Sequence, residues 1–161
     1  MSAVKAHFAA AGCANVTTYI QSGNVLFDAP AARVRRCIEN VRQRLAEACG
    51  EDAVLMVRSL RAVAEIVERA PFGARSADPT LKLYVVFLAR RPRRRIAVPF
   101  ADEKERLEAI AVCGREAYVV SGRKSSGFYG FPNAFVERAL GIAATSRNWS
   151  TVRKLAALGA D

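Results

Sequence analysis

Residues 17–28, with the sequence TTYIQSGNVLFD, constrain the fold of this chain more than any other stretch. Residues 16–20 are rich in β-branched and aromatic side chains, and residues 25–27 are again apolar. Between them, Ser22, Gly23 and Asn24 form a sequence that favours a tight turn. Two short β-type runs around such a turn predict an antiparallel hairpin.

The remaining periodicities predict an alternation of helices and strands. The chain opens on a helix that ends at Gly12, and its longest helix is expected from residue 30 to Cys49. Further helices are expected from Ser59, at 132–140 and at about 146–157, strands at 54–58 and 82–89, a helical turn at 101–105, and a second hairpin from 107–112 and 117–121.

This order of elements resembles a ferredoxin-like unit used twice. The expected fold class is therefore α+β, with two ferredoxin-like α/β repeats whose helices pack on antiparallel sheets. The first repeat is expected in residues 1–80, which include a connecting helix. The second is expected in residues 81–161, which end in a helix.

Five segments also resemble an uncharacterised bacterial family. They are TYIQSGNVLF at 18–27, VRS at 57–59, APF at 70–72, GRE at 114–116 and TSRNWSTVRKL at 145–155. Together they are similar to the domain-of-unknown-function family numbered 1697. The resemblance implies ferredoxin-like α+β repeats in two layers. It implies no mechanism, because the activity of that family is not established.

Members of that family usually begin with a strand and a glycine-bearing loop, whereas here Met1 stands where the first helix begins. The missing strand would be central in a ferredoxin-like sheet, and its neighbours would be left with unpaired backbone groups. We therefore expect that the true start lies upstream, or that another segment or chain fills the gap. A homo-oligomer formed through this vacant strand position is one possible outcome.

The sequence gives no indication of a membrane segment, a metal site or a cofactor. No apolar run reaches the ~20 residues that cross a bilayer, and no signal peptide opens the chain, so a soluble cytoplasmic protein is expected. The cysteines at 13, 37, 49 and 113 have no paired spacing, and the chain has a single histidine. We expect reduced cysteines acting as small hydrophobic side chains.

No set of residues specifies a reaction. The chain has no Walker loop, no dinucleotide-binding glycine fingerprint and no Gly-x-Ser-x-Gly turn. His7 stands alone, and the carboxylates are scattered along helices. We therefore assign no catalytic residue, and catalysis by this chain alone is not expected.

The formal net charge of +10 makes an anionic partner a reasonable hypothesis. Two segments are candidates for nucleic acid, although each has a simpler interpretation. The first is the arginine loop, which is either a phosphate-binding segment or a solvated loop. The second combines Arg123 and Lys124 with Phe128, Tyr129 and Phe131, as surfaces for single strands do, unless Phe128 and Phe131 are buried. The arginine loop contains Arg90, Arg91, Arg93, Arg94 and Arg95.

A small-ligand site is the alternative hypothesis. Its candidates at the first hairpin are Tyr19, Gln21, Ser22 and Asn24, which offer polar side chains unless Gly23 and Asn24 only supply the backbone conformation of the turn. The other candidates are Arg58, Arg147, Asn148 and Trp149, the last three at an expected helix start that suits phosphate. Alternatively, Trp149 belongs to the core with Val152, and Thr145 is an ordinary helix cap.

The sequence thus leaves three hypotheses for function. The first is a non-catalytic binding module for an anionic partner, with nucleic acid as the leading candidate. The second is a small-ligand protein or enzyme with a site between the Ser22–Asn24 turn and the Arg147–Trp149 helix start. The third is an assembly protein that pairs strands with a partner chain.

Overall fold

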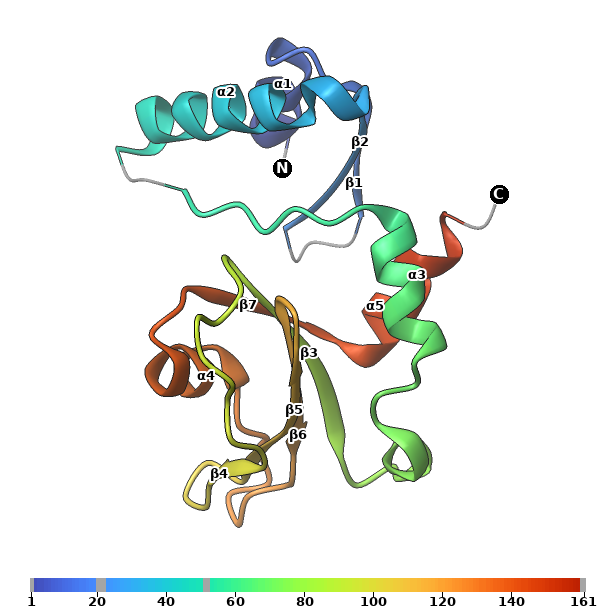
Figure 1. The fold of residues 1–161 in the computed structure, drawn as a ribbon, viewed down its shortest axis with the longest axis vertical. Helices are drawn as coiled ribbons and strands as arrows, with labels where there is room; N and C mark the ends of the chain where they lie inside the picture. Colours follow the sequence, from blue (N-terminus) through green and yellow to red (C-terminus); the bar gives the residue numbers. More distant parts are fainter. Residues whose placement is uncertain (1, 20–22, 51–52, 160–161) are drawn as a thin grey trace. The chain divides into compact units, whose positions relative to one another are not determined.

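The computed structural model describes residues 2–19, 23–50 and 53–159 and divides the chain into two compact units, Met1–Leu55 and Met56–Asp161 (Figure 1). The division falls between residues 55 and 56, whereas the expected repeats meet between residues 80 and 81. The helix that was expected to connect the repeats therefore belongs to the second unit. Each unit is described separately below.

The first unit contains two helices and one hairpin. Its strands pair antiparallel, with Tyr19 opposite Asn24 and Thr17 opposite Leu26. The predicted hairpin is therefore confirmed, although Ile20, Gln21 and Ser22 lie outside the described residues. In chain order the elements are α1 (Ser2–Ala10), β1 (Ala14–Tyr19), β2 (Asn24–Asp28) and α2 (Ala31–Cys49).

The core of the first unit forms where the apolar faces of these elements meet. The predicted long helix is confirmed as α2, and its side chains Cys37, Val41 and Leu45 are buried. Phe8 of α1 packs in the same cluster, and its ring centroid lies 5.3 Å from that of Phe27 on β2. The helix ends at Gly50, which adopts a left-handed conformation that favours glycine.

The second unit is built on a five-stranded antiparallel sheet with the order β4-β5-β6-β3-β7. Helix α3 begins at Ser59, whose side chain accepts a hydrogen bond from the backbone N–H of Ala62. The elements are α3 (Leu60–Glu68), a 3₁₀-helix (Gly73–Ala77), β3 (Lys82–Leu88), β4 (Phe100–Asp102), β5 (Leu107–Cys113), β6 (Glu116–Ser121), α4 (Pro132–Leu140), β7 (Ala144–Asn148) and α5 (Trp149–Ala157).

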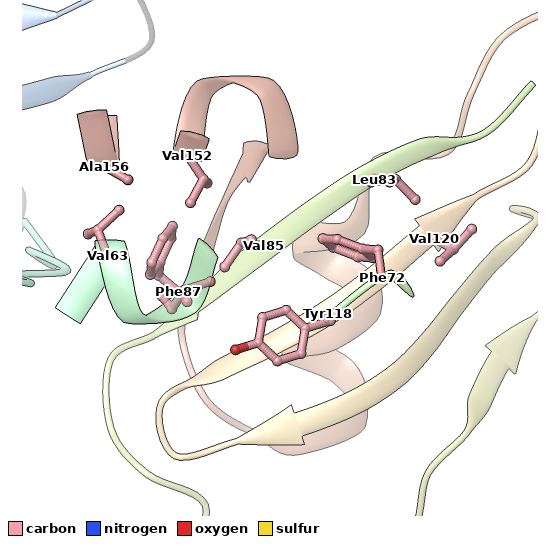
Figure 2. Packing of buried hydrophobic residues seen from close by; sticks show 10 residues of the cluster. Val63, Phe72, Leu83, Val85, Phe87, Tyr118, Val120, Val152 and Ala156 are labelled. Atoms are coloured by element: carbon pink, nitrogen blue, oxygen red, sulfur yellow. The ribbon is translucent and has the colours of Figure 1, made fainter. Parts of the chain in front are cut away.

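Strand β3 is buried on both faces, as its continuous apolar sequence predicts. On one face, Val85 and Phe87 pack with α3 and α5, and Figure 2 shows these side chains converging with Val152. On the other face, Tyr84 and Val86 pack against α4. The sheet therefore lies between two helical layers. With two antiparallel sheets and five α-helices in the described part of the chain, the fold class is α+β.

Two expected elements are wrong, and a third begins later than expected. Residues 54–58 form no strand, and Val54 is 58% exposed. Residues 101–105 form the end of β4 and a turn instead of a helical turn. The final helix begins at Trp149, because residues 144–148 pair with β3, with Arg147 opposite Val85. Pairing with the central strand outweighs the helical preference of this segment.

Candidate nucleic-acid interface

Two of the ligand candidates at the first hairpin, Tyr19 and Asn24, take part in closing that hairpin. Asn24 lies opposite Tyr19, and its side-chain amide donates a hydrogen bond of 3.1 Å to the carbonyl of Tyr19. Gln21 and Ser22 lie outside the described residues. The geometry here is that of a hairpin stabilised by its own side chains.

Arg58 is a buried structural cation. Its Nε donates to Glu116 Oε1 at 2.6 Å, and the two side chains are only 7% and 13% exposed. Its other nitrogens donate to the backbone carbonyls of Val57, Leu88 and Arg115. These bonds connect the segment before α3 to the sheet, so the structure places Arg58 in the framework.

The expected helix start at residues 147–149 is also part of the framework. Arg147 lies in β7, where its Nη1 donates to Thr145 Oγ1 and to the carbonyl of Ser146. Its side chain is half-buried, and this burial lowers the pKa of the guanidinium. Asn148 precedes α5 and makes no side-chain cap bond. Thr145 lies within the strand, so its expected role as a helix cap is wrong.

Trp149 belongs to the core, which confirms the simpler of its two interpretations. Its ring is partly buried in the cluster on the α3–α5 face of the sheet. The ring centroid lies 5.2 Å from that of Phe72 in an edge-to-face arrangement. This ring stabilises the second unit.

The arginine loop is an exposed segment between β3 and β4, as the sequence predicts. Arg90, Arg91, Arg93, Arg94 and Arg95 are all exposed, and they lie outside regular secondary structure. Arg90 donates to the carbonyl of Gly141. Residues 89–99 contain no aromatic side chain, so the loop offers charge without a stacking platform.

The loop of residues 122–131 between β6 and α4 is ordered by its own hydrogen bonds. Arg123 forms an isolated β-bridge with Tyr129, and the N–H of Lys124 donates to the carbonyl of Phe128 at 2.8 Å. The N–H of Gly127 donates to the carbonyl of Lys124, and Arg123 Nε donates to the carbonyl of Gly127. The segment is thus a small hydrogen-bonded hairpin.

Two phenylalanines of this loop face solvent. Phe128 is 74% exposed and Phe131 is 63% exposed, so the simpler interpretation, in which both rings are buried, is wrong. Phe131 touches Tyr84 edge-to-face at 6.1 Å between centroids. The core on that side of the sheet is filled by other residues, among them Phe135 and Val136 of α4. Fully burying a phenylalanine stabilises a protein by about 1.5–3 kcal/mol, and these two rings do not gain it from folding.

Cationic side chains lie on and beside this loop. Lys82 Nζ lies 4.6 Å from the centroid of the Tyr129 ring, and the Tyr129 hydroxyl donates to the carbonyl of Thr80. Arg106 is exposed, and its carbonyl accepts from the N–H of Gly122. Lys124 forms an ion pair with Glu105. We define the basic–aromatic surface as Lys82, Arg106, Arg123, Lys124, Phe128, Tyr129 and Phe131.

Sequence reasoning found the loop members of this surface and missed Lys82 and Arg106. The sheet register brings these two beside the loop, because Ser121 at the end of β6 lies opposite both Lys82 and Leu107. Lys82 and Arg106 could have been found from the sequence by pairing the predicted strands 82–89, 107–112 and 117–121 in one sheet.

The cysteines and acidic residues suggest no second site. Cys13 and Cys37 are buried, and burial together with the neighbouring Cys37 raises the pKa of the Cys13 thiol. Cys49 and Cys113 are exposed. Within residues 2–19, 23–50 and 53–159, no cluster of three metal-ligating side chains occurs. None of the described helices is long and apolar enough to span a membrane.

Comparison with known proteins gives one match. The family model described as "Protein of unknown function (DUF1697)" matches residues 1–118, most of the chain. The matched range does not include β7 and α5, which contain the TSRNWSTVRKL segment. No curated protein and no solved structure matches. The chain belongs to the DUF1697 family of proteins of unknown function.

Proposed function

We propose that this chain is a non-catalytic binding module that recognises nucleic acid through the basic–aromatic surface. The observation that carries the proposal is the pair of exposed rings, Phe128 and Phe131, on a hydrogen-bonded loop bordered by cations. Stacking of one base on an aromatic side chain contributes about 1–3 kcal/mol. Lysine and arginine beside the rings supply phosphate contacts.

The charge balance of the surface supports an anionic partner. Lys124 has a carboxylate partner in Glu105, whereas Lys82, Arg106 and Arg123 have no ion pair within 4.0 Å among the described residues. Asp102, in the nearby β4, pairs with Arg138. The loop that carries the two exposed rings therefore contains or adjoins three cations without ion-pair partners.

The sheet topology supports the finer assignment of the fold. We propose that the second unit is a ferredoxin-like repeat in which β3, β5, β6 and β7 are the four strands. Their spatial order, β5-β6-β3-β7, with α4 between β6 and β7, matches that of a βαββαβ unit whose first helix is replaced by the segment of residues 89–106. We propose that the first unit is another ferredoxin-like repeat that is only partly present. We also propose that the protein is located in a bacterial cytoplasm.

Fluorescence anisotropy of labelled nucleic acid tests the proposal. We expect affinity for single-stranded DNA to fall by about one order of magnitude between about 50 and 200 mM salt. The variant Lys82→Ala/Arg106→Ala/Arg123→Ala should lose most of this affinity. A matched control, Arg33→Ala/Arg35→Ala/Arg36→Ala, removes the same charge from exposed positions of α2. Equal losses in the two variants, or weak binding that does not respond to salt, would refute the proposal.

Strand-pairing assembly is a second candidate, favoured by one observation. In the described residues the sheet of the first unit has two strands, so β1 and β2 each have a free edge. Light scattering over a range of concentrations tests it, and a strict monomer contradicts it. The small-ligand or enzyme hypothesis, with a site between Ser22–Asn24 and Arg147–Trp149, stays a prediction from the sequence, because these segments belong to different units.

A further inference from the structure

We infer that the nucleic acid bound by this surface is single-stranded, and that two of its bases stack on Phe128 and Phe131. This inference rests on the proposed function and adds the class of nucleic acid. The inference starts from how much of each aromatic ring on this surface is exposed to solvent. Both rings are mostly exposed, while the remaining ring of the surface, Tyr129, is only half-exposed.

Tyr129 does not serve as a stacking platform. The Lys82 ammonium lies over its ring at 4.6 Å, and its hydroxyl donates to the carbonyl of Thr80. A cation in that position already uses the ring. The ring of Tyr129 is therefore occupied by Lys82, and base stacking falls to Phe128 and Phe131.

The two platforms are held in place before any ligand arrives. Phe131 precedes the first residue of α4 and contacts Tyr84, which is 6% exposed in the sheet. Phe128 lies in the loop closed by the bonds between Lys124 and Phe128 and between Gly127 and Lys124. Ordering of the loop is therefore completed during folding, so little conformational entropy is lost on binding.

The spacing of the rings suits a flexible strand. Phe131 lies three positions after Phe128, so the Cα atoms of the two residues are at most about 10–11 Å apart. Neighbouring or next-but-one nucleotides of a single strand can reach both rings. In a duplex the faces of the bases are covered by their stacked neighbours, and a base must be extruded before it can stack on protein. The exposed rings therefore favour single strands.

Three oligonucleotides of equal length separate the two contributions in the full chain. One is single-stranded oligo-dT, one is a duplex, and one is an abasic strand that keeps every phosphate and lacks bases. We expect oligo-dT to bind at least about tenfold more tightly than the other two. Phe128→Leu and Phe131→Leu each remove a ring and keep apolar bulk. Each should weaken oligo-dT binding by about 5- to 150-fold, the equivalent of one lost stacking contact, and leave binding of the abasic strand unchanged.

The controls remove exposed apolar side chains elsewhere. Val54→Ala and Leu158→Ala change residues that are 58% and 46% exposed and should leave all three affinities unchanged. Far-UV circular dichroism of each variant checks that it is folded, and Phe128→Trp and Phe131→Trp should keep or raise oligo-dT affinity.

The outcomes distinguish the inference from the proposed function. Salt-dependent binding of equal strength to all three oligonucleotides overturns the inference and leaves the proposed function standing. Unchanged oligo-dT affinity in both leucine variants also overturns it. If none of the three oligonucleotides binds at about 50 mM salt, both the inference and the proposed function are overturned.

Discussion

Tyr118 carries a polar group into the core of the second unit. Its side chain is 3% exposed, and its hydroxyl has no hydrogen-bond partner among the described residues. The ring itself packs edge-to-face on Phe72, with 5.9 Å between centroids. Burial raises the pKa of the phenol to about 12. The aromatic ring therefore stabilises the core, while the hydroxyl contributes nothing comparable.

We predict that Tyr118→Phe leaves the free energy of unfolding unchanged or slightly higher at pH 7, because it removes an unpartnered buried group. Above pH 10 the unfolded chain ionises Tyr118 while the folded chain keeps it neutral, so stability falls as pH rises towards 12. The loss of stability approaches about 3 kcal/mol once the pH exceeds the folded-state pKa of about 12. Urea unfolding of both proteins at pH 7, 9 and 11 measures this difference. A clear loss of stability at pH 7 in the variant would contradict the prediction.

The buried ion pair between Arg58 and Glu116 can also be tested. Breaking a buried ion pair from one side leaves a charge without compensation, so Glu116→Ala should destabilise the protein by about 3–5 kcal/mol. The control is Glu65→Ala, which breaks the exposed Arg61–Glu65 pair and should cost at most about 1 kcal/mol. Equal effects of the two variants in urea unfolding would show that the buried Arg58–Glu116 pair contributes no more to stability than an exposed pair.

At the scale of elements, the sequence predicts those helices and hairpins that are stabilised by interactions between residues close together in the chain. The first hairpin, α2, α3, α4 and the β5–β6 hairpin all have their own periodicity, turn residues or caps. Strand β7 has none of these, because TSRN is polar and its strand geometry comes from pairing with β3. Residues 54–58 show the reverse, since an apolar run without a described pairing partner forms no strand.

The loop of residues 122–131 depends on a close approach at Gly130. A Cβ at this position would lie 2.4 Å from the carbonyl oxygen of Glu105 and 2.9 Å from Leu107 Cγ. Gly130→Ala should therefore displace the loop, lower the free energy of unfolding by about 1–3 kcal/mol and weaken oligo-dT binding. Ser126→Ala, an exposed change in the same loop, should alter stability by no more than about 0.5 kcal/mol. Urea unfolding and anisotropy decide, and wild-type values for Gly130→Ala would contradict the prediction.

At the scale of the whole molecule, the composition indicates an anionic partner, and the sheet topology indicates where on the second unit that partner binds. The net charge and the mixture of Arg123, Lys124 and aromatic residues are visible in the sequence. Lys82 and Arg106 join them only through the sheet register, which no local pattern contains. The exposure of Phe128 and Phe131 also depends on how other side chains fill the core. The candidate site was therefore predictable only in part.

The second unit holds two apolar clusters, one on each face of its sheet, together with the whole basic–aromatic surface. We predict that a fragment of residues 56–161 folds cooperatively and binds oligo-dT with an affinity within about threefold of that of the full chain. The reason is that no residue of the basic–aromatic surface lies in the first unit. Circular dichroism during urea unfolding, followed by anisotropy, tests this. A folded fragment without affinity would show that the surface alone is insufficient.

The salt dependence of oligo-dT binding tests the central claim most directly. If Lys82, Arg106 and Arg123 each contact a phosphate, the slope of log affinity against log salt should be about −2. It should approach zero in the Lys82→Ala/Arg106→Ala/Arg123→Ala variant and stay near −2 in the Arg33→Ala/Arg35→Ala/Arg36→Ala control. Identical slopes in all three proteins would contradict the account.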